Sequence, residues 1–325
     1  SGGATSINGL TDAITNSSGE TIGLGTGALA NDDGSGNDNT ALGYQAGNDI
    51  TTGNNNVTIG YQAGDKLTTG LKNIAIGTQA MHTNGTTHDG VIAIGHQAME
   101  SAGPTDSFVA IGQNAARYNT PGSSAVFIGF NAALYAPTGS SNVAIGYEAM
   151  YGVNGSPITE YGNVAIGRGA MYAAKNAAIG NTALGAYTLD LVNGGDYNTA
   201  VGYDSGDSIT TGSNNTVIGN GADASSATVS NEFTLGNSSI SSLRCQVQTI
   251  SSLSDRRDKK DIEELPLGID FINTLKPVKF TWNMRDGAKI GQQEAGFIAQ
   301  DLDEAQIDAD AEDYLSLVLK NNPDK

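Results

Sequence analysis

The chain has 325 residues, a formal net charge of −18 and 44 glycines, with 38% hydrophobic and 6% aromatic residues. One compact core normally holds more aliphatic and aromatic mass, so these values favour an elongated architecture. The single cysteine, Cys245, excludes an intrachain disulfide, and no apolar run is long enough to span a membrane as a helix. Residues 1–253 carry only 6 of the 16 lysines and arginines, scattered singly, which argues against binding of nucleic acid.

One nine-residue unit recurs along the first 236 residues. Representative copies read NTALGYQAG at 39–47 and NVAIGYEAM at 142–150. The anchoring glycines from Gly43 to Gly146 are 17 or 18 residues apart, and the later spacing varies from 13 to 22. A constant core with connectors of variable length predicts that the cores stack while the Thr-, Asn-, Gly- and Ser-rich connectors loop out.

Each unit is expected to form a short strand, a sharp bend and a second short strand. A period of two places Val143 and Ile145 on one side of the strand and Ala144 on the other. The following Gly146 permits the bend, and a helix would not tolerate two or three glycines per unit at about 1 kcal/mol each. The predicted fold is mainly β, a repetitive β-solenoid or β-roll shaft over residues 1–236, with residues 237–253 as shaft end or linker.

The apolar content of one unit is small relative to the entropy lost on ordering its backbone. Stacking on neighbouring repeats supplies part of the missing burial, and several chains around a common axis would supply the rest while covering exposed strand edges. The N-x-A-I-G pattern resembles the repeats of phage tail fibres and the heads of trimeric autotransporter adhesins. That resemblance, and not the periodicity, implies a homotrimer.

An aromatic residue follows the anchor glycine in several copies. Such a ladder either packs against the next repeat or stacks on sugar rings of a receptor. The tyrosines at this position, which are candidates for ligand stacking, are Tyr44, Tyr61, Tyr147 and Tyr203.

The shaft offers no clear catalytic or metal-binding pattern. His82, His88 and His96 have spacings that fit no standard ligand set, so no metal and no cofactor are expected. The carboxylates are scattered in the connectors, and no pair of them stands out for glycoside hydrolysis.

The composition changes abruptly at Ser254, where the charged stretch SDRRDKKDI begins. Beyond it, LGIDFINTL at 267–275 has helical apolar spacing, and PVKFTWN at 277–283 alternates as a strand. EAGFIAQDLDEA at 294–305 is expected to run from a strand into a helix. This segment is predicted to be a small α/β domain over residues 254–325.

Two motifs in this segment resemble the C-terminal intramolecular chaperone of phage tail spikes, tail fibres and endosialidases. One is GFIAQ at 296–300. The other is Ser-Asp-x-Arg-x-Lys followed by an acidic residue and Ile, met here by Ser254, Asp255, Arg257, Lys259, Asp261 and Ile262. The family's domain usually continues into a helical tail, so this chain is expected to stop before that tail.

The resemblance implies a domain that trimerises, aligns three shaft chains and is then released by cutting the bond between Leu253 and Ser254. Ser254 is the expected nucleophile and Lys259 its base, because a lysine can act as a base when neighbouring cations lower its pKa. Asp255 and Arg257 are expected to orient the segment. At most, the chain is a Ser-Lys peptidase that acts once on itself.

The function expected from these features is that of a structural and receptor-binding phage tail fibre. Its partners would be two further copies of the chain, a host cell-surface receptor expected to be a glycan, and other tail or virion proteins, without nucleic acid or membrane insertion. It would be assembled in the host cytoplasm and act outside the cell on the virion tail. The alternatives are a tail-spike polysaccharide depolymerase and the head of a bacterial trimeric adhesin.

Overall fold

The chain forms two compact units, Ser1–Arg244 and Cys245–Lys325, which are described separately. The computed structural model describes residues 13–16, 20–34, 38–82, 87–103, 106–118, 122, 124–135, 139–152, 161–174, 178–244, 260, 263–283, 290–315 and 317–318.

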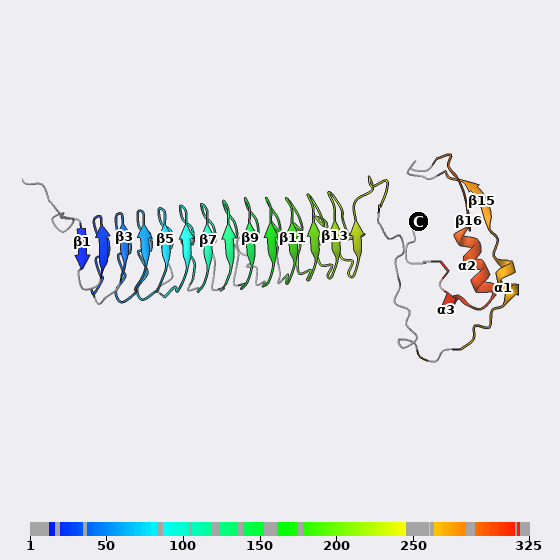
Figure 1. The fold of residues 1–325 in the computed structure, drawn as a ribbon, viewed down its shortest axis with the longest axis horizontal. Helices are drawn as coiled ribbons and strands as arrows, with labels where there is room; N and C mark the ends of the chain where they lie inside the picture. The colour runs from blue at the N-terminus through cyan, green and yellow to red at the C-terminus, as the bar shows by residue number, and fades with distance from the viewer. Residues whose placement is uncertain are drawn as a thin grey trace, which may run out of the picture. The chain divides into compact units, whose positions relative to one another are not determined.

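The first unit is a β-solenoid built on one 14-stranded sheet whose strands follow each other in chain order (Figure 1). The strands are β1 (Ala13–Asn16), β2 (Thr21–Leu24), β3 (Thr40–Leu42), β4 (Val57–Ile59), β5 (Ile74–Ile76), β6 (Ile92–Ile94), β7 (Val109–Ile111), β8 (Val126–Ile128), β9 (Val143–Ile145), β10 (Val164–Ile166), β11 (Thr182–Leu184), β12 (Thr199–Val201), β13 (Thr216–Ile218) and β14 (Phe233–Leu235). Strand β1 pairs antiparallel with β2, and every later pair is parallel. The prediction of a repetitive, mainly β shaft is confirmed.

The strands stack in register, so equivalent residues of successive repeats form columns along the solenoid. Ala144 of β9, for example, lies between Phe127 of β8 and Ala165 of β10. The expected spacing of 13 to 22 residues is wrong, because the bend after β11 is at Gly185 and the repeats are 17, 18 or 21 residues apart. The register holds at each of these spacings, because connectors of different length join the same rungs.

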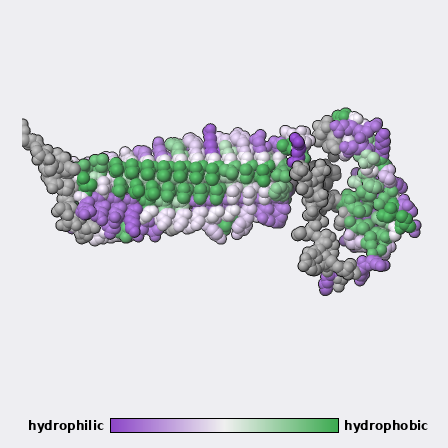
Figure 2. Space-filling model, in the orientation of Figure 1, coloured by the Kyte–Doolittle hydropathy of each residue, from purple (hydrophilic) through white to green (hydrophobic). Residues whose placement is uncertain are grey.

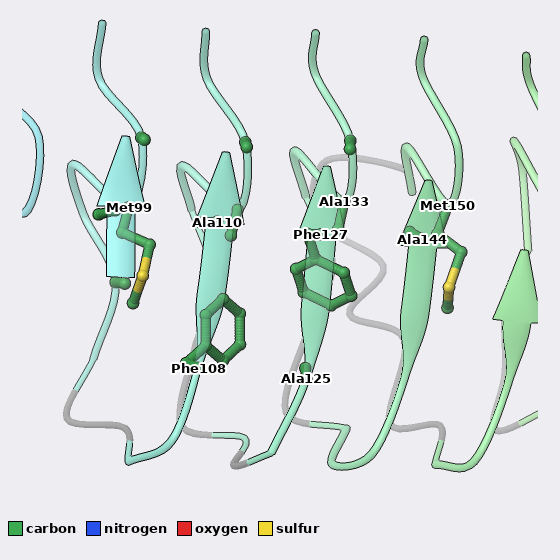
Figure 3. Close-up of a cluster of buried hydrophobic side chains, with 14 of the residues drawn as sticks. Met99, Phe108, Ala110, Ala125, Phe127, Ala133, Ala144 and Met150 are labelled. Carbon is green, nitrogen blue, oxygen red and sulfur yellow. The ribbon is translucent and has the colours of Figure 1, made fainter. Parts of the chain in front are cut away.

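The middle residue of most strands points into the solenoid and is small. In strands β3, β5 to β7 and β9 to β12 it is a buried alanine. The exception in β8 is Phe127, whose ring meets that of Phe108 edge to face with centroids 5.2 Å apart (Figure 3). Each large ring is balanced by an alanine two positions away in its own rung, Ala125 beside Phe127 and Ala110 beside Phe108. The interior is therefore thin, and it is filled by alternating large and small residues.

A second interior column comes from residues after the bend. Met99, Met150, Met171 and Leu189 stand four positions after their anchor glycines and are fully buried. All four adopt positive φ values between 48° and 53°. Unbranched methionine fits an irregular gap of this kind.

A buried asparagine precedes most strands and ties neighbouring rungs together. The Oδ1 atom of Asn56 accepts the backbone N–H of Asn73 at 3.0 Å, while its Nδ2 atom donates to the Gly70 carbonyl at 2.8 Å. The ladder stops after Asn73 and resumes at Asn142. Between these points Val91, Phe108 and Ala125 take its place, so apolar packing replaces the amide hydrogen bonds there.

The anchor glycine turns the chain at the end of each strand. Gly60 has a φ of 131°, and a Cβ atom on it would lie 2.6 Å from the Gly77 carbonyl oxygen. No residue with a side chain fits this position.

The predicted second strand after the bend is wrong. The chain runs there through turns, in which Gln62 (φ 53°) and its equivalents adopt the left-handed conformation. Its backbone still bonds the next rung, as in the 2.8 Å bond from the Gln62 N–H to the Tyr44 carbonyl. Inter-rung hydrogen bonds therefore persist without extended backbone.

The second unit has the predicted α/β elements. Helix α1 (Ile269–Thr274) precedes the antiparallel strands β15 (Val278–Thr281) and β16 (Gln293–Gly296), and helices α2 (Ala299–Asp308) and α3 (Glu312–Leu315) follow. The predicted helix within 267–275, strand within 277–283 and strand-to-helix run within 294–305 are confirmed. Among the described residues, no helix is long and apolar enough to cross a lipid bilayer.

Candidate functional site

The outer side of the solenoid's sheet carries an almost unbroken apolar surface, which we call the Val/Ile face (Figure 2). It consists of the first and third residues of β4 to β10, which are valine or isoleucine and only partly buried. The face continues on β11 to β13 with threonine in the first column and Leu184, Val201 and Ile218 in the second. The larger apolar side chains therefore point outwards, while the alanines between them fill the interior.

The tyrosines predicted for ligand stacking lie on the surface after the bend. Tyr44, Tyr61, Tyr147 and Tyr203 are between 46% and 53% exposed. The rings of Tyr44 and Tyr61 stack with centroids 5.4 Å apart, and Phe130 stacks on Tyr147 at 5.2 Å. Stacking along the column and exposure to solvent thus occur together, so both interpretations of the ladder are compatible with the structure.

A second aromatic column was missed by the sequence analysis. Tyr118 stacks on Tyr135 at 5.3 Å, and Tyr151 stacks on Tyr172 at 4.9 Å. These residues stand five or six positions after their anchor glycines. Aligning the repeats on those glycines would have placed them in one column.

The same column also carries polar pairs that join neighbouring rungs. The His82 Nδ1 atom lies 2.7 Å from Asp65 Oδ1, and Arg117 pairs with Glu100. Burial raises the pKa of the Asp65 carboxyl, and the neighbouring His82 opposes that rise. Each pair joins consecutive rungs and so favours the register.

Towards the end of the solenoid this column becomes acidic, with Asp190 and Asp207 in successive rungs. Asp223 follows in the next rung, four positions after its anchor glycine. Burial raises the pKa of Asp190, and the charges of Asp207 and Asp204 add to the rise. The pKa of Asp207 is raised in the same way, by burial first and then by Asp223 and Asp204.

The three histidines of the shaft have separate environments. His82 pairs with Asp65, His88 is buried, and His96 lies exposed in the column that follows the anchor glycines. In the part of the chain that the structure describes, no three His, Cys, Asp or Glu side chains gather so as to hold a metal ion.

The C-terminal unit exposes much of its apolar surface. Leu265, Ile269, Ile272 and Ile290 are each more than 50% exposed. A groove of about 370 Å³ runs between the start of α1 and the end of α2. Apolar exposure on this scale in so small a unit is typical of a surface that other chains cover.

Residues 254–311 match the family model described as the chaperone of endosialidase. The C-terminal unit is an endosialidase-type chaperone domain. None of the curated proteins compared with the chain matches it. Chaperone domains of this family direct trimerisation, release themselves by autoproteolysis and are typical of phage tail proteins.

The residues expected to cut the chain at the start of the chaperone domain lie outside the described residues. They are Leu253, Ser254, Asp255, Arg257 and Lys259. Their roles therefore stay predictions that rest on the motif.

Proposed function

We propose that this chain is the shaft and receptor-binding part of a phage tail fibre, which functions as a homotrimer. Three solenoids would pack along a common axis through their Val/Ile faces, and the chaperone domain would bring them into register. The Val/Ile face is the observation that carries this proposal.

The chemistry of the face supports packing against identical copies. Its side chains are mostly β-branched and stand in straight columns, so a second flat sheet can pack on them over many rungs. None of the outward positions of the described strands β2 to β14 carries a charge. Three chains with a formal net charge of −18 each can therefore meet along this face without bringing like charges together.

The need for a chaperone follows from the repetition. Nearly identical rungs allow two chains to pair one or more repeats out of register at little cost in contact energy. A C-terminal domain that trimerises first fixes the starting register, from which the solenoids can align. Release by cleavage between Leu253 and Ser254, with Lys259 as base to the Ser254 hydroxyl, would then make the alignment irreversible.

Sedimentation of the purified chain tests the trimer. We expect a single species with the mass of three 33.2 kDa chains, or of three shafts where cleavage has occurred. A stable folded monomer would contradict the proposal.

A gel of freshly expressed protein beside Ser254→Ala tests cleavage. The unmodified chain should yield a shaft band and a small C-terminal band, whereas the variant should stay full length. Full-length bands in both lanes would contradict the proposed autoproteolysis, but they would not contradict the proposed trimer.

Incubation of the labelled chain with a panel of bacterial strains tests receptor binding. We expect adsorption to some strains only, without release of reducing sugar from their surface polysaccharide. Release of sugar would instead identify a depolymerase.

A further inference from the structure

A groove of about 230 Å³ opens on the solenoid beside Tyr172 of the second aromatic column. Its lining residues are Glu148, Arg168, Gly169, Tyr172, Tyr187 and Asp190, which come from three successive rungs. All of them follow the anchor-glycine bend, whereas the Val/Ile face lies on the strands.

The groove exists because one side chain is missing from a column. The second position after the anchor glycine holds Gln97, Asn114, Asn131 and Glu148 in four successive rungs, all with φ between 53° and 56°. Gly169 occupies the next rung with a φ of 61°. The backbone conformation is unchanged, so the glycine opens space in this column between Glu148 and Tyr187.

Aromatic rings form the walls of this space. One face of the Tyr172 ring stacks on Tyr151, with the ring centroids 4.9 Å apart. The opposite face of Tyr172 is therefore turned towards the next rung, which forms the other wall of the groove. On that wall Tyr187 reaches over Gly169, because its Cδ1 atom lies 3.0 Å from where a Cβ atom of residue 169 would be. The C–H face of a sugar ring packs on tyrosine rings of this kind.

Two polar groups of the groove, on Arg168 and Asp190, have room for further hydrogen bonds. The Arg168 guanidinium lies 5.4 Å from the ring centre of Tyr147 and 5.6 Å from that of Tyr187. Within the described residues it has no carboxylate within ion-pair distance. The Oδ1 atom of Asp190 is buried and lacks a hydrogen-bond partner among the described atoms. A donor held between two rings and an orphaned acceptor therefore line the same groove.

We propose that this groove binds a neutral saccharide ring. Hydroxyl groups can donate to Asp190 and Glu148 and accept from Arg168, while the ring stacks on tyrosine. Two carboxylates against one guanidinium, with further aspartates in the following rungs, disfavour an acidic sugar. The volume lies below the roughly 300 Å³ at which pockets for drug-sized ligands begin, so it suits one ring. The inference deepens the proposed receptor-binding role and depends on it for its biological meaning.

The test is saturation-transfer NMR and calorimetry on the full chain with lactose, maltotriose and chitotriose as neutral probes and sialyllactose as the acidic one. Gly169→Asn should fill the groove and push the Tyr187 ring aside, because that ring lies 3.0 Å from where the new Cβ atom would be. Asparagine adopts nearly the same φ at residues 114 and 131. Gly221→Asn is the control for the change of backbone conformation, since Gly221 stands in the same column at φ 56° outside the groove. Arg168→Leu removes the central donor and leaves the backbone alone.

We expect at least one neutral probe to bind, with affinity at least tenfold weaker in Gly169→Asn and Arg168→Leu and within twofold of the unmodified chain in Gly221→Asn. Equal binding by Gly169→Asn, or a preference for sialyllactose, would overturn the inference. If no probe binds while the chain still adsorbs to bacteria, the groove is not a saccharide site and the proposed function stands. If adsorption to every strain is also absent, the proposed function fails with it.

Discussion

Replacing Phe127 by alanine tests whether the solenoid interior is packed within one chain. The Phe127 side chain is 1% exposed and contacts the ring of Phe108. Truncation of a buried phenylalanine costs about 3 to 5 kcal/mol when the site cannot collapse. Collapse is restricted here, because the rung is held on both sides by backbone hydrogen bonds of 3.0 Å, from Val109 N–H to the Ala125 carbonyl and from Val126 N–H to that of Asn142. We therefore expect a loss of about 4 kcal/mol.

The repeat itself supplies the matched rescue. Phe127→Ala combined with Ala125→Asn recreates the Asn-x-Ala rung found at Asn142 and Ala144. In the equivalent rungs the asparagine donates to a glycine carbonyl 14 residues later, as Asn56 does to Gly70, and a glycine stands at position 139. The double variant should regain about 1 to 2 kcal/mol of the loss through this bond and the smaller cavity.

Urea denaturation at one fixed chain concentration measures the loss, because the midpoint of an oligomer depends on concentration. Hydrogen exchange across residues 108–128 shows whether the opening is local. A loss below about 1.5 kcal/mol, or a double variant no more stable than the single one, would refute the packing argument, since Phe→Ala in a rigid core costs about twice that or more.

Three further outcomes follow from the structure. Gly60→Ala should lower the free energy of unfolding by at least about 2 kcal/mol in the same assay, because a φ of 131° is forbidden to alanine and the new Cβ atom would meet backbone. Gly90→Ala should lower it by about half as much, because nothing lies within 4 Å of its Cβ position. Equal losses would contradict this reasoning. Ile145→Asp should convert the proposed trimer to monomers in sedimentation, while Val143→Thr, which copies the residue in β11, should leave it intact. A trimeric Ile145→Asp would exclude this face as the interface. The raised pKa of Asp207 means that the folded chain binds the carboxyl proton more tightly than the unfolded chain does. The protonated carboxyl therefore contributes to the stability of the fold below the unfolded pKa of about 3.9, and this contribution is lost as the pH rises through the folded pKa. Hydrogen-exchange protection of β12 and β13 should fall from pH 4 upwards, and Asp207→Asn should reduce that fall.

The strands could be predicted from sequence because the repeat marks them directly. Val143 to Ile145 alternate, Gly146 ends the strand, and the in-register stacking follows from the constant core. The inward direction of Ala144 was harder to foresee, since hydrophobicity alone favours burying Val143 and Ile145. The interior is too thin for two branched side chains per rung, so the smaller residue turns inwards.

The conformation after the bend escaped prediction for a physical reason. Met150 and Gln62 adopt positive φ although neither is a glycine, and hydrogen bonds to the neighbouring rungs help to hold them there. The ladder of tyrosines after the anchor glycines was predicted from the repeat, whereas the groove beside Gly169 was missed. The groove depends on residues brought together from three rungs, which become neighbours only once the repeats are aligned by column.

Because each rung of the solenoid contacts only the rungs next to it, the number of rungs can change without disturbing the others. A duplication or deletion that begins and ends at equivalent glycines inserts or removes one complete layer, about 4.8 Å of rod, and leaves every remaining layer with neighbours of the right kind. Unequal recombination between copies can therefore adjust how far such a rod reaches. It can also bring new side chains next to existing ones in the same column, without a change of fold.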